Sequence, residues 1–557
     1  MNPKTEFLEE CKLLTRPHAN PSLLEVPPNN IADLALPCFS LSKKLKKDPA
    51  DIANELSVTI NKKIKKNGLI KTVRAMGPYV NFYTDDIKFS KLVIAMVLKQ
   101  KKLYGSGKKK NKKIMIEFAH PNTHKAFHIG HVRNISLGES ISRILEFNGY
   151  KVTRTNYQGD IGPHVAKCLW GYMHLGKKEP DNLEEKGKWL GLLYAEASKK
   201  VKNDLSIAEQ VAEINKKIYN GDKKLTEIWK KTRLWSLRYF DKIYEDFGTK
   251  FDKLYFESHV TDLGLKTVKR LLRIKKAKMS EGAVIIELGK ELGNFLLLKS
   301  DGTPLYSTKD LGLVQMEFKD FKPDEILHVV ANEQDLYFRQ LFATFKIINK
   351  LWYEKSRHLS YSLVILKSGK MSSREGDVIL YDDLLEKLYL KALETLIEKD
   401  RVDAKDIAHE IALAAIKYGM LKIDNQRTIT FDWEEALSIE GDTGPYLQYT
   451  HARANSILQR ASKTKKTNIS SLDRKEILLV KKMSDFPSVV EKSCRETKPS
   501  LMANYLHELA AIFNEFYQTT RVIDSDNESF RLNLVNAFKI TIANGLNLLG
   551  IKPLEKI

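Results

Sequence analysis

One short segment combines histidines and a glycine at spacings that could bind an anion. From Ile114 to Asn134 the chain reads IMIEFAHPNTHKAFHIGHVRN, an apolar run that gives way abruptly to polar residues. This pattern predicts a buried strand, a loop and a helix that begins near His128. Free N–H groups at a helix N-terminus attract phosphate, Gly130 permits close approach to the backbone, and His128 and His131 add two donors. The expected ligand is a nucleoside triphosphate.

The same histidines allow a second interpretation. His120, His124, His128 and His131 follow near-helical spacing, and imidazoles one turn apart can share a zinc ion. The proline and the glycine among them argue against one continuous helix, and no cysteine or acidic ligand stands at zinc-finger spacing. Nucleotide binding is therefore favoured, and no metal site is expected.

A second basic segment lies far downstream, where the apolar run Tyr361 to Leu366 is followed by KSGKMSSREGD. Two glycines that enclose small hydroxyl residues predict a mobile loop over 366–377, and its cations suit a phosphate that gains charge as a bond breaks. A solvated basic loop is the alternative. The HIGH and KMSSR segments, each after a strand and in this order, resemble the two signature motifs of class I aminoacyl-tRNA synthetases.

Composition narrows the class of protein. The 557 residues are 43% apolar, enough for several domains, and no apolar run approaches the length of a membrane span. The four cysteines are scattered without a CxxC pair, which fits a reducing cytoplasm. The formal charge of +22 should attract a polyanion, although charge alone does not distinguish RNA from DNA or a membrane surface.

The expected fold class is α/β. Residues 1–105 predict a small N-terminal α/β domain, in which Asp48 and Pro49 read as the cap and first residue of a helix. Residues 106–425 alternate strand and helix, which predicts a Rossmann-like parallel sheet with ligands at the carboxyl ends of its strands. A largely helical insertion is expected over 168–290.

The C-terminal region has a different pattern. After Asp403 the chain is nearly all helical in pattern, and no strand is expected there. Residues 426–557 predict an all-α helical bundle whose first clear helix begins near Gly444. The parallel sheet is expected to end with the mobile loop of 366–377, before this region begins.

A further pair of residues could determine which substrate binds. Tyr306 and Asp310 are four apart in DGTPLYSTKDLG and would share one helix face, so a phenol and a carboxylate could converge on a pocket. A cationic substrate would satisfy a buried carboxylate through charge-assisted hydrogen bonds, and Glu117 could supply a second negative group. In the alternative, Asp310 pairs with a lysine and Tyr306 belongs to the core.

Four segments together resemble the arginyl-tRNA synthetase family: DGTPLYSTKDLG, EFAHPNTHKAFHIGH, ANEQD and GPYLQYTHARANSIL. The N-terminal segment ending in GPYVNF is similar to the family's extra domain, which meets the elbow of the tRNA. The segment from Gly444 is similar to the start of its anticodon-binding domain. The resemblance implies L-arginine, ATP with Mg²⁺ and tRNA(Arg) as partners, rather than DNA or a membrane, and favours a monomer.

The resemblance also implies a role for each matching residue. Guanidinium contacts would fall on Glu117, Tyr306 and Asp310. Contacts to the α-amino and carboxylate groups would fall on Asn122, His128 and Gln334. The residues implied to bind ATP are Lys125, His128, Gly130, His131, Lys370, Met371 and Ser372, of which His128, His131 and Lys370 are the catalytic set.

Candidate contacts to tRNA lie in both outer domains. Tyr79, Asn81 and Phe82 could offer an aromatic and amide surface to an unstacked base, although edge-strand packing is the alternative. In the C-terminal domain the candidates are Tyr449 and Arg453.

Two positions depart from the family's usual pattern. His120 stands where relatives often have a serine, which puts the α-amino contact there in doubt. The second lysine of the general class I loop motif is replaced by Ser373, with Arg374 beside it. Lys125 and Lys370 are both present, so the sequence does not divide their roles.

The resulting hypothesis is a ligase that activates L-arginine with ATP and transfers it to the 2′-hydroxyl of the terminal ribose of tRNA. The resemblance implies that activation requires bound tRNA. Three alternatives stay open: a class I synthetase for another amino acid, a non-catalytic RNA-binding relative, and a small nucleotidyltransferase that acts without tRNA.

Overall fold

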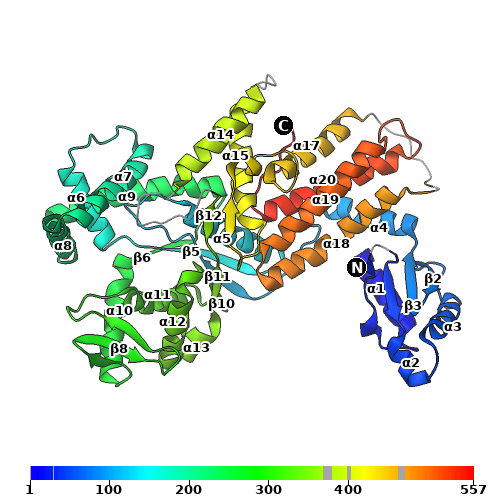
Figure 1. Cartoon of the computed structure of the whole chain (residues 1–557), viewed down its shortest axis with the longest axis horizontal. Coiled ribbons are helices and arrows are strands. Elements are labelled where there is room, and N and C mark those ends of the chain that lie inside the picture. Colours follow the sequence, from blue (N-terminus) through cyan, green and yellow to red (C-terminus); the bar gives the residue numbers. More distant parts are fainter. Residues whose placement is uncertain (1, 29–30, 368–378, 398–402, 462–468, 470) are drawn as a thin grey trace.

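The computed structural model describes residues 2–28, 31–367, 379–397, 403–461, 469 and 471–557. The predicted loop of 366–377 lies almost wholly outside the described residues, and so do Lys370, Met371 and Ser372. Figure 1 shows a small N-terminal domain, a central sheet with its helices, and a bundle of long C-terminal helices. Among the described helices, none has the length and apolar character needed to cross a bilayer.

The N-terminal domain is a three-stranded antiparallel sheet, in the order β1-β3-β2, with its own apolar core. The Asp48 carboxylate caps α3 by accepting the N–H of Ala50 at 2.8 Å, as the sequence predicts. This confirms the small α/β domain. Its elements are α1 (Pro3–Thr15), η1 (Pro21–Leu23), β1 (Leu34–Pro37), α2 (Phe39–Leu45), α3 (Pro49–Asn61), β2 (Ile70–Met76) and β3 (Tyr79–Thr84). Helix α4 (Asp86–Gln100) and η3 (Lys101–Leu103) lead to the sheet.

The central sheet has five parallel strands in the order β11-β10-β4-β5-β6. The chain runs from β4 outward to β5 and β6, then returns to the other side of β4 as β10. This change of direction opens a crevice at the carboxyl ends of β4 and β10, where such sheets bind ligands. The strands are β4 (Lys113–Glu117), β5 (Lys151–Gln158), β6 (Lys253–Phe256), β10 (Glu325–Ala331) and β11 (Ser356–Tyr361). The connecting elements are α5 (Ile129–Phe147), α10 (Glu257–Arg273), α11 (Tyr306–Phe321), η4 (Asn332–Gln334), α12 (Asp335–Ile348) and α13 (Lys350–Lys355).

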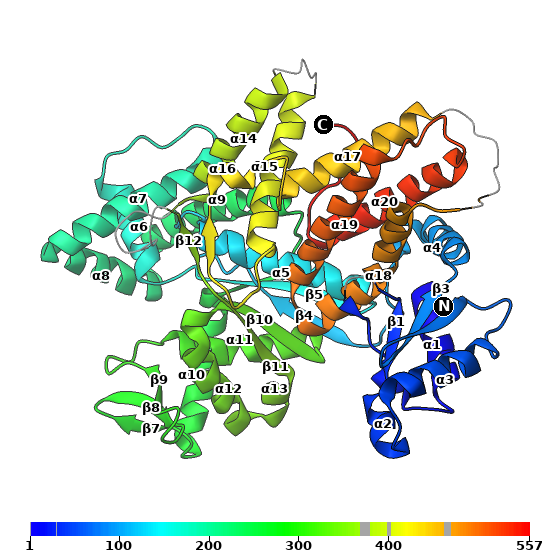
Figure 2. The ribbon, with the colours of Figure 1, turned by 45° about the vertical axis from the view of Figure 1, so that its right-hand side comes forward.

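The insertion differs from its predicted bounds of 168–290. Four helices lie between β5 and β6, and the separate antiparallel sheet β7-β8-β9 lies between α10 and α11. The sequence prediction missed β6 because a strand of four residues between long helices carries little periodicity. These inserted elements are α6 (Pro163–His174), α7 (Leu183–Asn203), α8 (Leu205–Tyr219), α9 (Lys223–Phe247), β7 (Lys278–Ser280), β8 (Ala283–Glu287) and β9 (Asn294–Leu298). They occupy two lobes beside the sheet (Figure 2).

The C-terminal region is a helical bundle that packs on α5, where Ser140 Oγ donates to the carbonyl of Leu548 at 2.9 Å. Helix α17 begins at Gly444, as predicted. The expectation of no strand after Asp403 is wrong, because β13 pairs in parallel with β12; each has only three residues, too few to show a pattern. The elements are β12 (Val364–Leu366), α14 (Tyr381–Ile397), α15 (Ala404–Leu421), β13 (Ile429–Phe431), α16 (Trp433–Ala436), α17 (Gly444–Arg460), α18 (Arg474–Glu496), α19 (Pro499–Thr519) and α20 (Glu528–Leu548).

Candidate active site

Helix α5 begins beside the crevice, and two histidines organise its first turn. His128 is the N-cap residue, and its Nδ1 accepts the backbone N–H of Gly130 at 3.1 Å. The backbone N–H of His128 in turn reaches Nδ1 of His131 at 3.3 Å. Because both Nδ1 atoms accept, both rings carry their proton on Nε2. Each ring can therefore donate to an anion from Nε2.

Burial keeps these two rings neutral. Burial and, to a smaller extent, the nearby charge of Lys125 lower the pKa of His128 to about 4. Burial, His128 and Lys125 also lower the pKa of His131 well below its usual value. The Lys125 ammonium lies 4.9 Å from the ring centroid of Tyr194 on the inserted α7. The site thus offers two neutral N–H donors and one cation next to a helix N-terminus.

Gly130 is needed here because of contact rather than backbone angle. A Cβ at this position would lie 2.9 Å from Cε1 of His128. We expect Gly130→Ala to displace the ring and to lower kcat/KM for ATP by about tenfold, the scale of a small misplacement of a reacting group. The KM for the amino acid should change less than twofold, by about the error of such assays. Steady-state kinetics with each substrate varied would check this, and an unchanged ATP dependence would contradict it.

The turn between β4 and α5 separates the histidines that the metal interpretation groups together. Residues Ala119, His120 and His124 have positive φ angles of 77°, 47° and 64°. His124 is buried in the core, where its Nδ1 and Nε2 pair with Thr123 at 2.9 Å and Thr232 at 2.8 Å. The four rings therefore do not form one helical stripe. Within the described ranges, no three His, Cys, Asp or Glu side chains are grouped to hold a metal ion.

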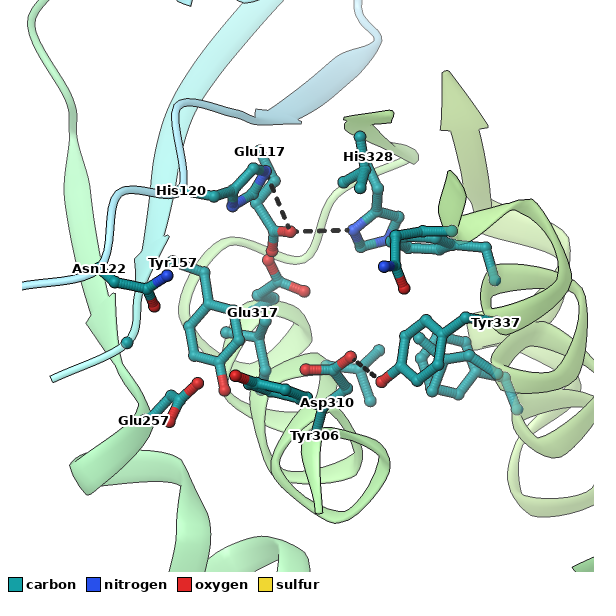
Figure 3. A pocket seen from close by; sticks show the side chains of 18 residues that line it. Glu117, His120, Asn122, Tyr157, Glu257, Tyr306, Asp310, Glu317, His328 and Tyr337 are labelled. Atoms are coloured by element: carbon teal, nitrogen blue, oxygen red, sulfur yellow. Dashed lines mark hydrogen bonds and ion pairs between the residues drawn. The ribbon is translucent and has the colours of Figure 1, made fainter. Parts of the chain in front are cut away.

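A cavity of about 370 Å³ opens at the carboxyl ends of β4 and β10, beside α11 (Figure 3). Five of the six residues predicted to bind arginine line it: Glu117, Asn122, Tyr306, Asp310 and Gln334. The sixth, His128, is not among the lining residues. The pocket therefore brings together predicted residues from three separate segments, whereas His128 lies at the neighbouring helix N-terminus.

Tyr306 and Asp310 share one face of α11, as predicted. Tyr306 is 60% exposed at the cavity, so it is not a core residue. Asp310 accepts a hydrogen bond from the Tyr337 hydroxyl rather than from a lysine. The pKa of Asp310 is raised to about 7, mainly by burial; the Tyr337 hydrogen bond opposes the rise, and Glu117 and Glu257 contribute to it. An acid with this pKa is poised to ionise when a cation enters.

Glu117 is held at the end of β4 by a residue that the sequence reasoning missed. His328, its register partner on β10, places Nδ1 3.3 Å from Glu117 Oε1. The Nε2 of His120 lies 4.0 Å from the same oxygen. Burial would raise the pKa of Glu117, but His328, His120 and a hydrogen bond from Glu317 outweigh burial and lower it. Glu117 is therefore a fixed negative charge in the pocket wall.

The cavity contains further polar residues without a sequence-based prediction. Glu257, the first residue of α10, forms a buried ion pair with Lys309 of α11. Its position directly after β6 was the available signal, and it was lost with that strand. Other missed residues are Tyr157, Glu317 and Tyr337. Glu317 had a signal in its spacing, since it lies seven residues beyond Asp310.

Two of the three candidate tRNA contacts in the N-terminal domain are buried. Phe82 is 0% exposed and Asn81 is 2% exposed, so the prediction that they present a surface to a base is wrong. Phe82 belongs to the domain core because the inner strand β3 is covered. Tyr79 is half-buried, with its ring 5.7 Å from that of the exposed Phe39.

Tyr449 and Arg453 line a cavity of about 410 Å³ in the C-terminal bundle. The Arg453 guanidinium lies 5.0 Å from the Tyr449 ring and 5.1 Å from the Tyr517 ring. An arginine beside two aromatic rings supplies both the cation and the stacking surfaces that nucleic-acid bases bind.

Each part of the chain matches the model of a known protein family. Residues 93–433 match tRNA synthetases class I (R), catalytic domain. Residues 4–84 match the arginyl tRNA synthetase N terminal domain, and residues 447–557 match the DALR anticodon binding domain. The parallel sheet, the histidine-capped helix and the catalytic-domain match define a class I aminoacyl-tRNA synthetase.

Individual relatives specify the family further. An arginine–tRNA ligase of Treponema denticola is 37% identical over 96% of this chain and 94% of its own length. That of Clostridium perfringens is 34% identical over 96% of both. The structure of Thermus thermophilus arginyl-tRNA synthetase superposes with a TM-score of 0.79 at 26% identity, covering 100% of both chains. The chain belongs to the arginyl-tRNA synthetase family.

Proposed function

We propose that this protein joins L-arginine to tRNA(Arg) in an ATP-dependent reaction, as a cytoplasmic monomer. The observation that carries the proposal is the acidic cavity, with Glu117 and Asp310 in its wall, next to the N-terminus of α5. Carboxylates bind a guanidinium strongly because charge-assisted hydrogen bonds combine attraction with geometry. The helix N-terminus suits the phosphates of ATP.

In the first step, the arginine carboxylate attacks the α-phosphorus of ATP, which gives arginyl-adenylate and releases pyrophosphate. The carboxylate is already a nucleophile, so catalysis comes from positioning and from stabilising charge on the phosphates. His128 and His131 donate from Nε2, Gly130 keeps the backbone accessible, and Mg²⁺ accompanies ATP. The loop residues Lys370, Met371 and Ser372 complete this site in the proposal, with Lys125 as a second cation.

In the second step, the 2′-hydroxyl of the terminal ribose of tRNA takes the arginyl group and releases AMP. The formal charge of +22 favours binding of the polyanion, and Tyr79, Tyr449 and Arg453 are the proposed contacts. Guanidinium recognition is assigned to Glu117, Tyr306 and Asp310, and the rest of the amino acid to Asn122 and Gln334. Activation that depends on tRNA is part of the proposal.

The pKa of Asp310 gives the reaction a specific pH dependence. With a pKa of about 7 in the free enzyme, this acid is mostly protonated below pH 7 and mostly ionised above it. Since only the ionised form pairs with a guanidinium, kcat/KM for arginine should be about tenfold lower at about pH 6 than at about pH 8. Aminoacylation with limiting arginine measures this.

The matched variant for the pH dependence is Tyr337→Phe. It removes the hydrogen bond that opposes the rise of the Asp310 pKa, so the inflection should move to higher pH. A flat profile in wild type, or an inflection that Tyr337→Phe leaves in place, would contradict the role of Asp310.

The experiment that tests the whole proposal is aminoacylation of total tRNA with each labelled amino acid, with and without ATP. Charging by arginine alone, and only with ATP, is the expected result. Charging by another amino acid would keep the class I reaction and overturn the pocket assignment. No charging at all would favour a non-catalytic RNA-binding protein.

A further inference from the structure

Glu317 is a buried acid beneath the proposed arginine pocket, and the inference drawn here depends on that pocket. It lies on α11, seven residues beyond Asp310 and eleven beyond Tyr306, on the helix face that lines the cavity. Its exposed fraction is 0%. Figure 3 shows its carboxyl group directly beside that of Glu117.

The oxygens between these two acids lack ordinary donors. In the described part of the chain, no N–H or hydroxyl group donates to Oε1 or Oε2 of Glu317, nor to Oε2 of Glu117. Two carboxylates that face each other away from water repel, and each would also lose its hydration. A single proton between them removes the repulsion and supplies the missing hydrogen bond.

The surroundings decide which acid holds the proton. Nδ1 of His328 lies 3.3 Å from Glu117 Oε1, and Nε2 of His120 lies 4.0 Å from it. No such nitrogen contacts Glu317 in the described structure, and the carboxylates of Asp310 and Asp320 on its own helix are close enough to disfavour a charge on it. Burial and Glu117 raise the pKa of Glu317 well above its ordinary value, whereas that of Glu117 is lowered.

We propose that Glu317 remains a neutral carboxylic acid that donates its proton to Glu117 and thereby positions the Glu117 carboxylate toward the arginine guanidinium. Glu317 is thus a positioning residue for amino-acid recognition. The neutral form of Glu317 also limits the negative charge of the pocket. Lys309 is not left to neutralise Glu317, because it already pairs with Glu257. Glu117 and Asp310 are then the two acids left to meet one guanidinium. The competing role for Glu317 is an ionised side chain that binds the guanidinium directly.

Two variants separate these roles. Glu317→Gln keeps a neutral donor of nearly the same shape, so kcat/KM for arginine should stay within about threefold of wild type, less than the loss of one hydrogen bond. Glu317→Leu removes the donor and leaves Glu117 Oε2 unpaired, so the KM for arginine should rise by about tenfold to a hundredfold. The KM for ATP should change in neither variant. Glu287→Gln, at the exposed last residue of β8, is the control substitution.

The two competing outcomes overturn the proposal in different ways. If Glu317→Gln loses as much arginine affinity as Glu317→Leu, the charge of Glu317 is what matters, and it is a direct ligand. If Glu317→Leu binds arginine normally, Glu317 positions nothing. Thermal unfolding of each variant separates a loss of fold from a loss of affinity.

Infrared difference spectroscopy tests the proton without relying on activity. At about pH 8, where an acid with the pKa of Asp310 is mostly ionised, wild type minus Glu317→Gln should show the C=O band of a protonated carboxyl group. Wild type minus Glu287→Gln should lack this band. Absence of the band in the first spectrum would overturn the proposal even if the enzyme charges tRNA with arginine. Failure of wild type to charge arginine would instead refute the proposed function.

Discussion

Replacing Asp310 by asparagine should lower kcat/KM for arginine by about three orders of magnitude. The variant keeps the volume of the side chain and can still accept the Tyr337 hydroxyl, so the pocket should keep its shape. The variant loses the negative charge that pairs with the guanidinium. When a buried site must bind a cation without its charged partner, kcat/KM for that cation falls by about 10³-fold to 10⁴-fold. Aminoacylation of tRNA at varied arginine concentration measures the loss.

The control for Asp310→Asn is Asp320→Asn on the same helix. Asp320 accepts the Tyr255 hydroxyl at 3.0 Å and is not among the residues that line the cavity. Its replacement should leave arginine kinetics within about twofold, because Asp320 does not line the cavity and asparagine can still accept the Tyr255 hydroxyl. Efficient use of arginine by Asp310→Asn would show that the cavity binds some other group, and would reopen the choice among amino acids.

Replacing His128 by asparagine should slow formation of the adenylate by about two orders of magnitude, the usual effect of one lost donor to a developing charge. Asparagine is a strong N-cap residue, so it can take over the hydrogen bond that His128 Nδ1 accepts from Gly130. It cannot reproduce the Nε2 donor that points from the imidazole to the phosphates in the proposed mechanism. Arginine-dependent pyrophosphate exchange in the presence of tRNA measures this step.

His128→Ala separates capping from catalysis. It loses the donor and the cap together, so it should be as slow as His128→Asn and also less stable by about 1 kcal/mol. Thermal unfolding gives the second quantity. Pyrophosphate exchange at the wild-type rate in His128→Asn would remove His128 from the catalytic set.

The parts of the fold that the sequence predicts are those in which the signal is local. The change from the apolar residues of β4 to a polar turn, followed by the cap of α5, lies within a single segment. The same holds for the Asp48 cap and for the start of α17 at Gly444. Strands β6 and β13 were missed because three or four residues carry too little periodicity to separate them from their neighbours.

The residues of the candidate site that the sequence predicts are also those with a local signal or a matching motif. Tyr306 and Asp310 could be paired from spacing because a helix fixes which residues share a face. The resemblance of motifs brought Glu117, Asn122 and Gln334 to them, and the cavity contains all five. Lys370 lies outside the described residues, so its role stays a prediction.

The sequence by itself determined which segments carry the chemistry: a helix N-terminus with its histidines, and a helix face with a phenol and a carboxylate. Only the tertiary structure decided their surroundings. It placed His328 of β10 against Glu117, more than two hundred residues earlier in the chain, and set Glu317 opposite the same carboxylate. The physical reason is that spacing within one element fixes direction, whereas burial and neighbouring charge, which set protonation, depend on contacts between elements.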